Sequence, residues 1–179
     1  MLRITIPAQE FFKEETFEFL KYEEVTLELE HSLVSISKWE SKWNKAFLSK
    51  REKNYEETMD YIKCMTLTPN VDDEVYSRLT RANIDAINKY IEAPMTASHM
   101  TEEQNSSGNE TVTSELIYYW MISLNIPVEF QEWHLNRLLT LIKVCNRKNS
   151  PPKKMGQQAL MNRNRSLNAA RRQQFNTHG

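Results

Sequence analysis

The order of apolar and polar residues changes twice along this chain, from a period of two, to a helical period, to no clear period. Residues 2–6 alternate apolar and polar side chains, and the alternation returns at 17–19 and 25–29. Such alternation is typical of strands that have one buried face and one solvated face. We therefore expect two or three short antiparallel strands within residues 1–32, forming a small sheet that needs a layer packed over it.

A helical period begins near residue 35. Ile36, Trp39, Trp43 and Phe47 recur at steps of three and four residues, which places them on one face of a helix. A row of aromatic residues on a helix can serve to stack on a peptide or a base. Because other apolar residues accompany this row, we interpret it as part of the core.

Further helices are predicted between residues 54 and 94. Asn54 followed by Glu57 has the form of a capping box at a helix start. Asp72 is placed to cap a short helix, and residues 84–91 have the pattern of an amphipathic helix that Pro94 ends.

The most apolar segment, residues 116–126, predicts a helix that is buried on all sides and includes Trp120. After a break at Pro127, a second helix is expected over 130–146, so that the two form an antiparallel helical hairpin. We expect this pair to be the most buried in the fold. Residues 95–111 are polar and aperiodic, and they predict an exposed loop.

Charge is distributed unevenly along the chain. No acidic residue follows Glu132, whereas ten of the 23 lysines and arginines do, so the first 132 residues hold the other 13 and all 24 acidic residues. This asymmetry indicates a folded body with a basic interaction tail. We predict an α+β fold: a single domain over 1–148, with a small N-terminal antiparallel β-sheet and a mainly α-helical part over 33–148, and a basic, conditionally helical C-terminal arm over 149–179. The arm residues expected to bind a partner are Lys153, Lys154, Arg163, Arg165, Leu167, Arg171 and Arg172.

Two classes of partner fit such an arm. Lysines and arginines that neutralise phosphates give salt-sensitive binding to nucleic acid, but stacking aromatics are not interleaved here, since Phe175 stands alone. A positive arm can equally bind an acidic protein surface, including the front of another copy, where glutamates gather between Glu10 and Glu30. We favour a protein partner or self-association over nucleic acid.

The sequence offers little for catalysis. Only three glycines occur, which is too few for a P-loop or a dinucleotide-binding loop. The four histidines lie in separate segments without the spacing of a metal site, and His134 is the one that we single out. Cys64 and Cys145 lie in apolar helical patterns and are expected to be buried free thiols. We expect no enzymatic activity, no metal, no cofactor and no membrane span.

Several distinctive strings occur along the chain: Ser35-Ile-Ser-Lys-Trp-Glu-Ser-Lys-Trp43, Ile91-Glu-Ala-Pro-Met-Thr-Ala97, Ile117-Tyr-Tyr-Trp-Met-Ile-Ser-Leu-Asn-Ile-Pro127, Trp133-His-Leu-Asn-Arg-Leu-Leu-Thr-Leu-Ile142, Asn149-Ser-Pro-Pro-Lys-Lys-Met155 and Asn164-Arg-Ser-Leu-Asn-Ala-Ala-Arg-Arg172. Together they resemble sequences of one protein family, the small tail-module proteins of tailed bacteriophages that are described as tail assembly chaperones. The resemblance covers nearly the whole chain.

The resemblance implies a function without catalytic or ligand residues. A protein of this kind binds the tape measure protein and the tail tube subunit in the host cytoplasm while the phage tail is assembled. The alternative that stays open is a structural subunit of the virion, in the tail, connector or baseplate. Binding of nucleic acid through the arm is a further alternative.

Overall fold

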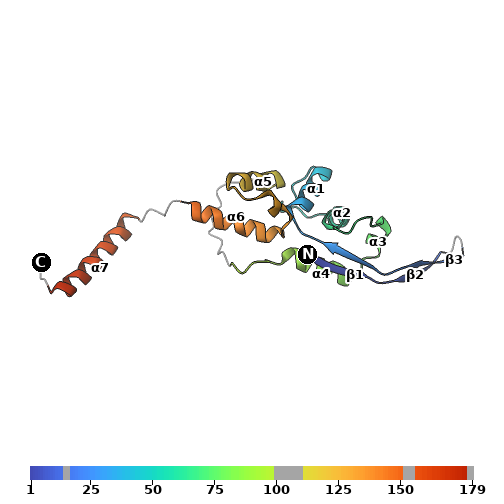
Figure 1. Ribbon diagram of the computed structural model, residues 1–179, viewed down its shortest axis with the longest axis horizontal. Coiled ribbons are helices and arrows are strands. Elements are labelled where there is room, and N and C mark those ends of the chain that lie inside the picture. Colours follow the sequence, from blue (N-terminus) through green and yellow to red (C-terminus); the bar gives the residue numbers. More distant parts are fainter. Residues whose placement is uncertain (14–16, 99–110, 151–155, 177–179) are drawn as a thin grey trace. The chain divides into compact units, whose positions relative to one another are not determined.

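The computed structural model describes residues 1–13, 17–98, 111–150 and 156–176. Antiparallel strands come first and helices follow, which is the predicted α+β class (Figure 1). The chain divides into two compact units, Met1–Asn146 and Arg147–Gly179. The predicted boundary at residue 148 lies close to this division.

Four strands form one long hairpin in the first unit. β1 (Leu2–Ile6) pairs with β4 (Val25–Leu29), and β2 (Gln9–Lys13) pairs with β3 (Glu18–Tyr22), both in antiparallel fashion. The sequence pattern predicted two or three strands, so the described hairpin contains one more than expected. The additional strand is β2, whose residues do not alternate as strictly as those of β1.

The two ladders of the hairpin share one register. Between the Leu2–Leu29 pair and the Gln9–Tyr22 pair, each strand advances by seven residues. Pro7 lies in the interruption between the ladders. A proline has no backbone N–H to donate, and within a ladder it would break the hydrogen-bond pattern. The interruption therefore inserts no extra residue on either side.

The β1–β4 ladder contributes one face to the core. Ile4, Ile6, Leu27 and Leu29 are all buried, as the period-two alternation requires. The helix α4 (Arg81–Glu92) packs on β1.

Two helices after the hairpin build the centre of the core. α1 (Leu33–Trp43) packs against α2 (Tyr55–Met65). The predicted capping box is confirmed, since the Asn54 side chain accepts from the backbone N–H of Glu57 and the Glu57 carboxylate accepts from the backbone N–H of Asn54. The indole Nε1 of Trp39 donates to the Glu57 carbonyl oxygen over 2.8 Å, which joins the two helices.

The aromatic stripe is core, as predicted. Trp39 and Phe47 are buried, and Trp43 is half-buried and stacks on Trp39 with a centroid distance of 6.1 Å. The ring of Phe47 lies 4.0 Å from that of Tyr61 on α2. The aromatic row therefore belongs to the core, with Trp43 at its edge, and is not an exposed stacking surface.

The remaining helices between the hairpin and α7 complete the first unit, and the last of them extends past its end at Asn146. They are α3 (Asp73–Ser77), α5 (Ser114–Ser123), the 3₁₀-helix η1 (Val128–Glu132) and α6 (Leu135–Asn149). Asp72 precedes α3 as predicted, although its side chain makes no capping hydrogen bond. The helix predicted over 130–146 is divided, because η1 ends at Glu132 and α6 begins only at Leu135.

The predicted burial of α5 on all sides is wrong. α5 packs on α1 and buries Ile117 and Met121, whereas Tyr119 is 63% exposed and Ile122 is 76% exposed. Trp120 is half-buried at the edge of the core. An apolar composition alone does not say how much of a helix is covered, and α5 leaves Tyr119 and Ile122 exposed.

The α5–α6 pair is also not the most buried pair. α5 and α6 each bury three residues, whereas α1 and α2 each bury five. Cys64 and Cys145 are free, as predicted, but they are half-buried rather than buried. Most of the predicted loop at 95–111 lies outside the described residues, and Met95 at its start is exposed.

The second unit contains α7 (Gln157–Phe175), the longest helix that the structure describes. Arginine, glutamine, alanine and leucine are strong helix formers, and they make up most of α7. The helix ends at Asn176, which has the left-handed conformation (φ 52°) common at helix C-termini.

Candidate functional site

The predicted arm residues are spread over the surface of α7. Arg163, Leu167 and Arg171 follow one another at four-residue steps, and Arg165 and Arg172 are seven residues apart, so each set lies along one side of the helix. All five side chains are exposed. The other two predicted residues, Lys153 and Lys154, lie outside the described residues.

Apolar residues lie between these arginines. Leu160, Leu167 and Phe175 are separated by seven and eight residues, which is close to whole turns, so they share one side of α7. They are 47%, 46% and 69% exposed, and the nearby Met161 is 66% exposed. We call this row together with Arg163 and Arg171 the arm surface, and it combines apolar area with positive charge.

A second surface of exposed apolar residues lies on the β2–β3 ladder. Phe12 and Phe19 are directly paired across the strands, with ring centroids 5.0 Å apart, and Phe17 lies 6.3 Å from Phe12. The three rings are 48%, 67% and 82% exposed in the order Phe12, Phe19, Phe17. We call these three phenylalanines the hairpin surface. The sequence pattern predicted one buried face for residues 17–19, and the structure contradicts this.

The hairpin carries excess negative charge. Residues 1–31 contain eight glutamates and three lysines or arginines. Glu10 and Lys21 form an exposed ion pair of 3.1 Å beside the hairpin surface, and such a pair contributes little to stability. The sequence contains a signal for this surface, because phenylalanines recur among glutamates. The alternation alone did not show which face of the strands stays exposed.

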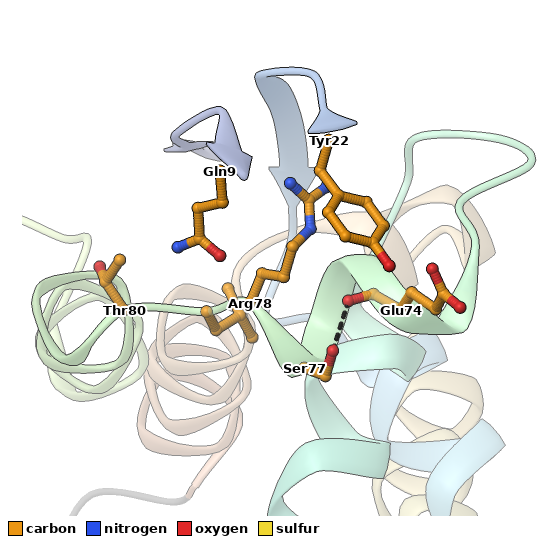
Figure 2. A pocket seen from close by; sticks show the side chains of 7 residues that line it. Gln9, Tyr22, Glu74, Ser77, Arg78 and Thr80 are labelled. Carbon is orange, nitrogen blue, oxygen red and sulfur yellow. Dashed lines mark hydrogen bonds between the residues drawn. The ribbon is translucent and has the colours of Figure 1, made fainter. Parts of the chain in front are cut away.

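A pocket of about 430 Å³ lies where the β2–β3 ladder meets the α3–α4 connection (Figure 2). The labelled residues come from the hairpin on one side and from the α3–α4 segment on the other. Its lining residues are Gln9, Tyr22, Glu74, Ser77, Arg78, Leu79 and Thr80.

Arg78 is the central residue of this pocket. Its side chain is buried, its Nη1 donates to the Glu23 carbonyl oxygen over 3.3 Å, and its guanidinium carbon lies 4.8 Å from the centre of the Tyr22 ring. Burial and the nearby Glu74 carboxylate raise the pKa of Tyr22. Because Arg78 contacts both Tyr22 and Glu23, it fastens the β2–β3 ladder to the body.

The chemistry of the pocket does not select a ligand. The Nε of Arg78 has no hydrogen-bond partner in the described part of the chain, but this atom is closed to solvent and a ligand could not reach it. The pocket also contains the carboxylate of Glu74 beside the guanidinium, so its charge is mixed. Ser77 donates to the backbone carbonyl oxygen of Glu74 over 2.6 Å and is not poised as a nucleophile.

The fold brings two histidines together that the sequence keeps far apart. The rings of His31 and His134 lie 5.1 Å from each other and both are buried. His31 Nδ1 is hydrogen-bonded to the Tyr61 hydroxyl over 2.5 Å. His134 Nε2 donates to the Tyr90 carbonyl oxygen over 2.9 Å, and its Nδ1 accepts from the backbone N–H of Asn136 over 3.3 Å.

These contacts make the histidine pair structural. Burial, followed by the neighbouring His134, lowers the pKa of His31 to about 3, and burial lowers the pKa of His134. Both rings are therefore neutral near pH 7. No group of three histidine, cysteine or carboxylate side chains that could hold a metal ion occurs among residues 1–13, 17–98, 111–150 and 156–176. The sequence could not show the pairing, because contacts over about a hundred residues bring the rings together.

Comparisons with known proteins add no assignment: no protein-family model, no curated protein and no solved structure matches this chain. Within the described residues, every helix is too short or too polar to cross a bilayer. Among the described residues, the arm surface on α7 and the hairpin surface on β2–β3 combine exposed apolar side chains with charge, which makes them candidates for binding a partner.

Proposed function

We propose that this protein is a tail assembly chaperone-like protein of a tailed bacteriophage, which binds the tape measure protein and the tail tube subunit through its arm. It acts by binding and has no catalytic role. The observation that carries the proposal is the arm surface on α7, in which Leu160, Leu167 and Phe175 are exposed beside Arg163 and Arg171.

The physical argument rests on what such a helix lacks. Most of the stability of a helix in a protein comes from packing of its apolar face, and the apolar row of α7 is exposed. A partner helix or sheet with apolar residues and acidic neighbours would bury this row and neutralise the arginines. Coupled ordering of this kind suits a protein that binds and later releases its partner.

The test is capture of the two tail proteins by the purified chain. We expect the full chain to capture the tape measure protein, and a chain with Leu160→Ser and Leu167→Ser to lose capture. A matched control carries Asn162→Ser and Ala169→Ser on the opposite side of α7 and should capture normally. Capture by the Leu160→Ser, Leu167→Ser chain at the level of the full chain would contradict the proposal.

Mass spectrometry of purified virions separates this function from the structural alternative. A chaperone is absent from the finished particle, whereas a subunit of the tail, connector or baseplate is present in a fixed copy number. Retention on DNA that falls steeply with salt, together with no capture of tail proteins, would instead support a nucleic-acid-binding role.

A further inference from the structure

We propose that the protein forms a reciprocal dimer, in which α7 of each copy lies on the hairpin surface of the other copy. The inference does not depend on the tail proteins. It follows from two exposed surfaces of the same chain that match in length and are opposite in charge.

The β2–β3 ladder requires a covering layer. A two-stranded hairpin by itself is at best marginally stable in water. Here Phe12 and Phe19 form a direct cross-strand pair whose rings remain 48% and 67% exposed, with Phe17 at 82%. Burying three phenylalanines would remove a contiguous apolar patch from water, which is the main driving force of association.

The arm surface has the matching dimensions. Leu160 and Phe175 are about 22 Å apart along an α-helix, at about 1.5 Å per residue. Each five-residue strand of the β2–β3 ladder is about 17 Å long, and Phe17 lies beyond the end of that ladder. One side of α7 therefore spans the hairpin surface from end to end.

Charge selects α7 as the occupant. Residues 9–22, which contain the β2–β3 ladder, carry four acidic and two basic side chains, whereas α7 has four arginines and no acidic residue. The exposed face of α5, with Tyr119 and Ile122, offers no such complement, because its nearest charged residue, Glu115, stands alone on that helix. Opposite charges steer α7 to the hairpin surface, and they give it no preference for the exposed apolar face of α5.

Two-fold symmetry makes the contact close on itself. Every copy carries one hairpin surface and one arm surface, so two copies satisfy both surfaces of each. In this arrangement the arm is occupied before a tail protein arrives, and a tail protein must compete with the second copy for α7.

The test uses the purified full chain alone, with its mass measured by light scattering at about 0.1 M and about 1 M salt. Over this range the screening length falls from about 10 Å to about 3 Å. We expect a dimer at low salt that dissociates partly at high salt. Phe12→Ser with Phe19→Ser, and separately Leu160→Ser with Leu167→Ser, should each give a monomer. The control Tyr119→Ser with Ile122→Ser should remain dimeric.

Charge reversal provides a second, independent test. Arg163→Glu with Arg171→Glu should abolish the dimer, and adding Glu10→Lys with Glu24→Lys to the same chain should restore it. A photoreactive phenylalanine analogue at position 17 should cross-link to α7 peptides, and mixing isotope-labelled with unlabelled chains should show that each cross-link joins two copies. A monomer at all concentrations, cross-links within one copy, or a dimer that survives both pairs of apolar substitutions would each overturn the inference. Capture of tail proteins is measured separately, so failure of one proposal is distinguishable from failure of the other.

Discussion

His31 and His134 face each other at 5.1 Å between ring centroids, although 103 positions separate them in the chain. Leu135 donates its backbone N–H to the His31 carbonyl oxygen over 2.7 Å, and Ser32 and His134 form an isolated β-bridge. The start of α6 is therefore attached to the segment between β4 and α1. The two rings lie directly at this junction.

This pair predicts that stability falls as the pH drops below about 6.5. The pKa of His31 is about 3 in the folded chain, below the ordinary value of about 6.5. As the pH falls, the unfolded chain therefore binds the proton at a higher pH than the folded chain. The free energy of unfolding has its full value above pH 6.5 and decreases from there toward pH 3. From pH 6.5 to 5 the free energy of unfolding should decrease by up to about 1.4 kcal/mol per pH unit for this group. Urea unfolding at several pH values measures the slope, which His31→Gln should reduce. An unchanged slope would show that His31 is not responsible.

Glu40 should be essential for the stability of the body. Its Oε1 accepts from the backbone N–H of Phe47 and its Oε2 from that of Ser114, both over 2.7 Å, and the residue is buried. Glu40→Ala would leave two buried donors unpaired, and we expect a loss of about 3 kcal/mol. Chemical denaturation is the measurement, with Glu52→Ala at an exposed position as the matched control. A loss equal to that of the control would argue against the bridging role.

Trp39 and Trp120, which both lie in helices of the first unit, should differ sharply in their contribution to stability. Trp39 is 1% exposed and donates to the Glu57 carbonyl oxygen, so Trp39→Ala should cost about 3–5 kcal/mol. Trp120 is only half-buried, and Trp120→Ala should cost about 1 kcal/mol. Equilibrium unfolding of the two variants in parallel tests this. Equal losses would mean that α5 is covered in solution, as it would be by a further partner.

Arg78 should control the mobility of the hairpin end rather than global stability. Arg78→Ala removes the contact with the Tyr22 ring and the hydrogen bond to the Glu23 carbonyl oxygen. The ring contact contributes about 1 kcal/mol, so amide exchange in β3 should become about fivefold faster. Exchange in α1 serves as the internal reference. Arg78→Lys should be intermediate, because it keeps the charge and loses the planar guanidinium.

Deletion of residues 152–179 should separate folding from binding. The first unit, Met1–Asn146, contains the whole buried apolar core of the described chain. The truncated chain should therefore unfold within about 0.5 kcal/mol of the full chain and fail to capture tail proteins. Thermal and urea unfolding check the first expectation. Unfolding of the truncated body would show that the arm is structural.

Local signals in the sequence predicted local structure well. The Asn54–Glu57 capping box and the Trp39–Phe47 stripe depend only on residues within one or two helical turns, and the structure contains both. The overall α+β class followed from the change of period near residue 35. These features were predictable because neighbouring residues determine them.

The predictions that failed concern contacts between residues that lie far apart in the sequence. The apolar composition of α5 predicted burial on all sides, but composition cannot show that Tyr119 and Ile122 are exposed in the described part of the chain. Alternation at 17–19 predicted one buried face, yet the body does not reach Phe17 or Phe19. The pairing of His31 with His134 depends on the whole path of the chain between them.

The shared register of the two ladders makes the end of the hairpin an exchangeable module. Because both strands advance equally through the interruption at Pro7, the β1–β4 ladder keeps its pairing whatever lies beyond it. Replacing residues 9–22 with a two-residue turn would leave Ile6 opposite Val25 and the core face unaltered. Longer, shorter or different tips can be grafted there, and the specificity of the hairpin surface can thus diversify without any change to the core.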